Sequence, residues 1–89
     1  MGYWVLEFRY TDLDLRARAR PEHLAYMTDL HDRGVLVLGG PIGDGGGAMA
    51  ILRTETEAQV AAIIAADPYT ISGASADHVV RRWSVSVGA

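Results

Sequence analysis

The chain has 89 residues, the size of one domain, and we expect a single domain over residues 1–89. It is 49% hydrophobic and 21% charged with a net charge of -3, and it contains no Cys, which excludes disulfides and thiolate chemistry. The acidic balance without a Lys/Arg cluster predicts no nucleic-acid partner, and no apolar run reaches the roughly 18 residues of a membrane span. Met1–Tyr10 lacks the pattern of a signal peptide, so we expect a cytoplasmic protein.

The first half of the chain predicts a strand, a loop, a helix and a second strand. These are expected at Tyr3–Tyr10, Thr11–Ala19, Pro21–Arg33 and Val35–Ile42. Pro21 suits the first turn of a helix because its missing N–H has no partner there, and Gly34 is a typical residue after a helix end.

The second half predicts a turn, a strand, a helix, a loop and a last strand. These are expected at Gly43–Gly47, Ala48–Arg53, Glu57–Ala66, Tyr69–Asp77 and His78–Val87. Thr54 and Thr56 are both candidate N-caps, and the segment from Thr54 resembles a capping box. The helix ends at Asp67 because Pro68 follows.

The order βαββαβ predicts an α+β, ferredoxin-like fold: a four-stranded antiparallel sheet with both helices on one face.

A small domain hides only about 60–65% of its unfolded surface, so 49% hydrophobic residues exceed the need of one small core. The excess falls on the second sheet face. The pattern places Tyr3 and Val5 of the first strand there, with one side each of the other three strands. In the second strand we expect Leu36 and Leu38 to share a face. In the last strand we expect one face to carry Val79, Trp83, Val85 and Val87. An open apolar face marks an interface, so we expect a homodimer packed sheet to sheet.

Two polar residues are predicted to meet at one end of this fold. Helical spacing puts His23 near the centre of the buried face of the first helix, and Asp67 on the sheet side of the second. The start of the first helix and the end of the second share one end of the domain. We interpret His23 and Asp67 as a catalytic pair, in which the carboxylate holds one imidazole tautomer and the other ring nitrogen moves the proton. A partly buried structural His and a helix-ending Asp are the alternative interpretation.

Three more residues are expected at the same end and are candidates for substrate binding. Arg20 would steer an anionic substrate. Tyr69 would form a hydrophobic wall or donate its hydroxyl group, and Pro41 is expected beside them. The neighbouring Arg16 and Arg18 are expected on a solvated loop. His23, His31 and His78 lack metal-ligand spacing, so we predict no metal and no cofactor.

Three segments resemble the YciI-like (YCII-related) family: Arg20-Pro21-Glu22-His23-Leu24, Gly39-Gly40-Pro41-Ile42 and Asp67-Pro68-Tyr69. The resemblance spans almost the whole chain. It implies a dimeric α/β barrel with a shared His and Asp as the active site, which correspond to His23 and Asp67. Relatives with a known activity include a dehydrochlorinase that acts on a chlorinated hydroxyquinol.

Two main functions remain open at this point, beside a third possibility, oxygen chemistry on an electron-rich aromatic compound. The first is a small cofactor-free enzyme of the lyase or isomerase type, in which His23 and Asp67 catalyse elimination or isomerisation of an enolisable or phenolic metabolite. The second is a non-catalytic dimeric domain that binds a small molecule or serves as an accessory domain.

Overall fold

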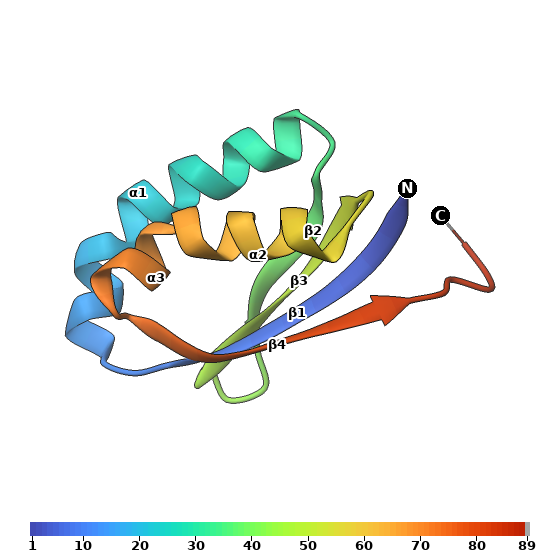
Figure 1. The fold of residues 1–89 in the computed structure, drawn as a ribbon. Coiled ribbons are helices and arrows are strands. Elements are labelled where there is room, and N and C mark those ends of the chain that lie inside the picture. Colours follow the sequence, from blue (N-terminus) through green and yellow to red (C-terminus); the bar gives the residue numbers. More distant parts are fainter. Residues whose placement is uncertain (89) are drawn as a thin grey trace.

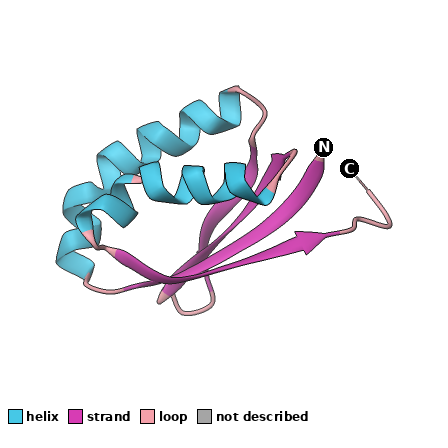
Figure 2. Cartoon of the chain, in the orientation of Figure 1, coloured by secondary structure: helices cyan, strands magenta, loops and turns pink. Residues whose placement is uncertain are grey.

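The computed structural model describes residues 1–88 as one antiparallel sheet with its helices packed on one face (Figure 1, Figure 2). The strands lie in the order β2-β3-β1-β4. In chain order the elements are β1 (Gly2–Tyr10), α1 (Leu13–Asp32), β2 (Leu36–Ile42), β3 (Gly47–Thr54), α2 (Glu57–Ala66), α3 (Pro68–Ser72) and β4 (Ser75–Trp83). The predicted ferredoxin-like α+β fold is confirmed, with α3 as an addition between α2 and β4.

The start of α1 corrects one prediction. Thr11–Ala19 is not a loop, because α1 already begins at Leu13. The Asp12 side chain caps this helix by accepting hydrogen bonds from the backbone N–H groups of residues 14 and 15, at 2.8 and 3.1 Å. Pro21 therefore lies inside the helix, where it removes one backbone hydrogen bond. Figure 1 shows α1 changing direction in its N-terminal half, as a proline in a helix interior commonly causes.

The second long helix, α2, has the predicted bounds. Of the two threonines predicted as its N-cap, Thr56 caps the helix and Thr54 does not. Gln59 completes a capping box, because its side-chain oxygen accepts from the Thr56 N–H at 3.0 Å while its own N–H donates to the Thr56 hydroxyl at 3.2 Å.

The last strand also differs from the prediction. It covers Ser75–Trp83 and not His78–Val87, and the predicted loop Tyr69–Asp77 contains α3 and the start of β4. The predicted strand residues Val85 and Val87 lie beyond its end. Asp77 has a left-handed φ of 55°, and the pairing of β4 with β1 shifts register beside it. This bulge determines which β4 side chains face the helices.

The core lies between the sheet and the helices. It contains one face of β1 and β3, joined by apolar side chains of the helices, and its β1 and β3 members are Trp4, Leu6, Phe8, Tyr10, Ala48, Ala50 and Leu52. This alternation is the predicted one. Leu30 of α1, Val60 of α2 and Tyr69 of α3 are almost completely buried against it.

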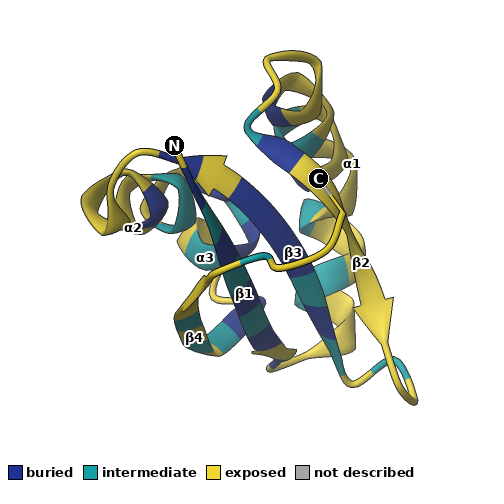
Figure 3. Cartoon of the chain, turned by 90° about the vertical axis from the view of Figure 1, so that its right-hand side faces the viewer, coloured by how far each residue is buried: buried dark blue, intermediate teal, exposed yellow. Residues whose placement is uncertain are grey.

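The sheet face turned away from the helices, which we call the outer face, carries exposed apolar side chains. Val79 and Trp83 lie opposite Glu7 and Tyr3 on this face and are about half exposed. On β2 a register shift places Leu36 opposite the core residue Leu52 but Leu38 opposite Ile51. The prediction that Leu36 and Leu38 share one face is therefore wrong. Figure 3 shows exposed segments of β2 and β4 on either side of the more buried β1 and β3.

Candidate active site

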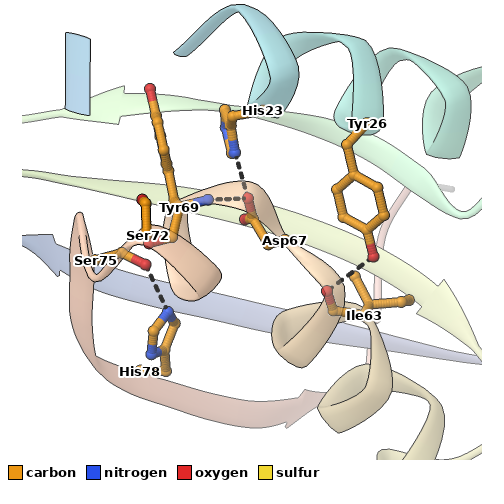
Figure 4. A network of polar contacts seen from close by, with 8 residues as sticks. All are labelled: His23, Tyr26, Ile63, Asp67, Tyr69, Ser72, Ser75 and His78. Atoms are coloured by element: carbon orange, nitrogen blue, oxygen red, sulfur yellow. Dashed lines mark hydrogen bonds and ion pairs between the residues drawn. The ribbon is translucent and has the colours of Figure 1, made fainter. Parts of the chain in front are cut away.

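His23 and Asp67 form a buried pair between α1 and the junction of α2 with α3 (Figure 4). His23 Nδ1 lies 2.7 Å from Asp67 Oδ1, and only 11% and 9% of the two side chains are exposed. An ionised carboxylate only accepts hydrogen bonds, so His23 Nδ1 carries the proton in this pair. No hydrogen bond engages His23 Nε2 within residues 1–88, so this ring nitrogen is available for proton transfer.

Asp67 is held in place by the backbone on both sides. It ends α2 with an extended ψ of 127°, the conformation that a following proline favours. It also caps α3, because Asp67 Oδ1 accepts the Tyr69 N–H at 2.9 Å. A single carboxylate oxygen thus binds both His23 and the start of α3.

Tyr69 forms one wall of the site. Its ring stacks on the His23 imidazole with centroids 3.7 Å apart and planes 6° from parallel. Burial raises the pKa of the Tyr69 hydroxyl, and the positive charge of Arg16 opposes this shift. The hydroxyl is therefore neutral at physiological pH and acts as a hydrogen-bond group. The stacking restricts the imidazole to the plane in which Nδ1 meets Asp67.

A small cavity of about 90 Å³ lies beside His23. The predicted binding residues Arg20, Pro41 and Tyr69 all line it, whereas Asp67 lies behind His23 and does not. The volume is below the roughly 300–1,000 Å³ typical of drug-sized ligand sites, so a ligand here is small or extends out through the opening.

The helical start of α1 adds one residue that sequence reasoning missed. Arg16 lines the cavity together with Arg20 and His23. The three positions are four and three residues apart, which places them on one side of a helix. The spacing was visible in the sequence, but the interpretation of Thr11–Ala19 as a loop hid it.

A second polar pair lies on the β4 side of Asp67 and was also missed. His78 Nε2 is 3.1 Å from the Ser75 hydroxyl, and the His78 ring is tilted against Phe8 at 5.5 Å (Figure 4). Burial lowers the pKa of His78, and the negative charges of Asp67 and Asp77 oppose this shift.

A wider hollow of about 380 Å³ lies between α1 and α2 on the other side of Tyr26. Tyr26 donates its hydroxyl proton to the Ile63 carbonyl at 2.8 Å (Figure 4). None of the predicted site residues lines this hollow, so we place the candidate site at the smaller cavity, where the His–Asp pair lies.

Across residues 1–88, no three His, Asp or Glu side chains cluster as metal ligands, and no helix has the length and apolar character to cross a membrane.

A ferredoxin-like sheet with a buried His–Asp pair beside a small aromatic cavity defines an α+β domain with a candidate acid–base site. The chain belongs to the YCII-related domain family, whose model matches residues 1–84. The resemblance found in the sequence is thus confirmed.

One solved structure relates the chain to a protein of stated activity. The chain is similar to a 5-chloro-2-hydroxyhydroquinone dehydrochlorinase from Burkholderia phenoliruptrix, solved in complex with 2,5-dihydroxybenzoquinone. The two are 28% identical with a TM-score of 0.76, and the match covers 91% of this chain and 93% of the other. No curated protein matches the chain.

Proposed function

We propose that this protein is a small cofactor-free enzyme that catalyses elimination or isomerisation of an enolisable or phenolic metabolite. The observation that carries the proposal is the 2.7 Å contact between His23 Nδ1 and Asp67 Oδ1 beside a cavity that His23 lines. The related dehydrochlorinase, which acts on a chlorinated hydroxyhydroquinone, supports the same class of substrate.

His23 Nε2 would act as the general base. It removes a proton from a hydroxyl group, or from a carbon next to a carbonyl, and Asp67 stabilises the imidazolium that forms. In an elimination, the electron pair left by the proton forms a new double bond, and the leaving group departs with its own electron pair. The imidazolium then gives the proton to water. In an isomerisation, the imidazolium returns the proton to a different atom of the substrate. Arg20, Tyr69 and Pro41 would hold the substrate.

We also propose that the protein is a homodimer that buries the outer face of the sheet. Its support is the row of partly exposed apolar residues on that face, which include Leu38, Val79 and Trp83. Such a face is unusual for a monomer.

The proposal is tested with His23→Gln and Asp67→Asn variants and 5-chloro-2-hydroxyhydroquinone as the first substrate. We expect chloride release by the wild type, a loss of about 100-fold or more in His23→Gln, and a smaller loss in Asp67→Asn. His31→Gln is the matched control, because His31 lies on the same helix but does not line the cavity. It should keep wild-type activity.

Two outcomes would contradict the enzyme proposal. Turnover that survives in His23→Gln would remove His23 from the mechanism. Binding of phenolic ligands without turnover of any substrate in a panel of enolisable and phenolic compounds would favour the non-catalytic binding domain.

A further inference from the structure

Arg16 holds a buried polar atom that lacks a partner. Its guanidinium lies over the Tyr10 ring, with Cζ 4.5 Å from the ring centroid. Its Nε atom is buried and makes no hydrogen bond within residues 1–88. Native proteins rarely leave a buried donor of a charged group unsatisfied, because the loss of hydration is costly. Arg16 therefore keeps hydrogen-bonding capacity that the protein does not use, and the residue lines the cavity beside His23.

The charges around Arg16 favour an anion as that ligand. Arg16 and Arg20 both line the cavity with His23, and no Asp or Glu is among the lining residues. In the described part of the chain, the arginines that form ion pairs are Arg9, Arg33 and Arg81, all at the surface. The positive charge of the cavity is thus balanced by no carboxylate in its wall.

The shape of the cavity favours a flat ligand. Phe8, Tyr10 and Tyr69 line it, and the Tyr10 and Tyr69 rings pack edge to face at 5.9 Å. A guanidinium is itself planar and binds the oxygens of carboxylates and similar groups in its own plane. The volume of about 90 Å³ limits the buried part of a ligand to roughly one ring.

We infer that Arg16 is the anion-binding and specificity-determining residue of this site, and that the ligand is a small planar oxyanion such as a phenolate, enolate or carboxylate. Its charged oxygen accepts a hydrogen bond from the Arg16 guanidinium, and the atom that loses the proton faces His23. The inference rests on the proposed function and adds to it the charge of the substrate.

The test is isothermal titration calorimetry with 2,5-dihydroxybenzoquinone and 2,5-dimethoxybenzoquinone. The first is a vinylogous acid that ionises readily, and the second is a neutral analogue. The wild type should bind the anion at least about ten-fold more tightly than the neutral compound. Arg16→Gln should lose about ten-fold or more of the anion affinity but little of the neutral affinity.

Two further variants control this result. Arg18→Gln should keep wild-type binding, because Arg18 is exposed on the same helix and does not line the cavity. Arg16→Lys keeps the charge but loses the planar guanidinium, and it should bind the anion with intermediate affinity. If Arg16→Gln does not fold, the Lys variant and the salt dependence of the wild type decide the question. Salt should weaken binding of the anion but not binding of the neutral compound.

The inference is overturned if the wild type binds neither compound, if it binds both equally, or if Arg16→Gln or a folded Arg16→Lys variant prefers the anion as strongly as the wild type. Its failure is separable from failure of the proposed function. Charge-selective binding without turnover would refute the enzyme but keep the anion site. Turnover that depends on His23 but is equal for charged and neutral substrates would keep the enzyme and refute the anion site.

Discussion

His78 is a half-buried histidine whose surroundings disfavour its charged form. Burial lowers its pKa below the ordinary 6.5, and the nearby carboxylates of Asp67 and Asp77 reduce that shift without reversing it. Ser75 lies within hydrogen-bond distance of its Nε2. A histidine with a lowered pKa binds its proton less readily in the folded protein than in the unfolded chain. Acid therefore favours unfolding at this residue.

We expect the free energy of unfolding to fall as the pH decreases from above 6.5 through the lower pKa of folded His78. Above pH 6.5 both states are neutral at this residue and the effect vanishes. His78→Gln should make the decline shallower, which urea unfolding at pH 7.5, 6.5 and 5.5 would measure. Identical pH profiles for the wild type and His78→Gln would contradict the assignment.

The His23–Asp67 pair was easier to predict from the sequence than the positions of Arg16 and His78. His23 and Asp67 follow from helical periodicity and from Pro68, which are local signals. The position of Arg16 depends on whether the residues before Pro21 are helical. Pro21 favours a helix start at its own position, which leaves Arg16 on a predicted loop. His78 depends on a bulge at Asp77, and an aspartate in a strand segment carries no signal strong enough to predict a left-handed backbone.

At the scale of elements, α1 is the feature that most affects the site. Its first two turns carry Arg16 and Arg20 to the cavity, and they precede the proline that interrupts the helical hydrogen bonds. This segment has one strong terminal support, the Asp12 cap. The start of α1 should therefore be sensitive to the loss of that cap.

We expect Asp12→Ala to lower the free energy of unfolding by about 1 kcal/mol, because two backbone N–H groups lose their acceptor. Urea unfolding followed by circular dichroism would measure the change. Asp32→Ala removes a carboxylate at the opposite end of the same helix, where a negative charge is unfavourable, and should be neutral or slightly stabilising. Equal effects of the two substitutions would show that Asp12 does not act as a cap.

Element types were easier to predict than element ends. The alternation of β1 and the length of α2 follow from side-chain pattern, and the structure reproduces both. The bounds of α1 and β4 depend on competition between local signals and packing. Pro21 favours a helix start that the Asp12 cap overrides, and Val85 and Val87 continue a pattern after the strand has ended.

At the scale of the molecule, the outer face is apolar at both sheet edges. Leu38 lies on edge strand β2, and Val79 lies on edge strand β4. Glu7 and Arg81 form an ion pair in the same face, which gives a partner both apolar and charged contacts.

We expect the wild type to be a dimer at micromolar concentration, and the double substitution Leu38→Lys with Val79→Lys to yield monomers. Two lysines on the outer face would bring uncompensated charge into the proposed apolar interface. Size-exclusion chromatography with light scattering would measure the mass. Ile71→Lys is the control, because Ile71 is equally apolar and 73% exposed but lies on α3, away from the outer face. A monomeric wild type would refute the dimer.

The shared oxygen of Asp67 fixes the orientation of the His23 imidazole before any ligand arrives. The atom that orients His23 also closes the first turn of α3, so the imidazole cannot lose its partner without disturbing the path of the backbone. The Tyr69 ring that follows that turn fixes the imidazole plane. The entropy lost in orienting the base is therefore lost once, when the chain folds, and not again at each encounter with a ligand.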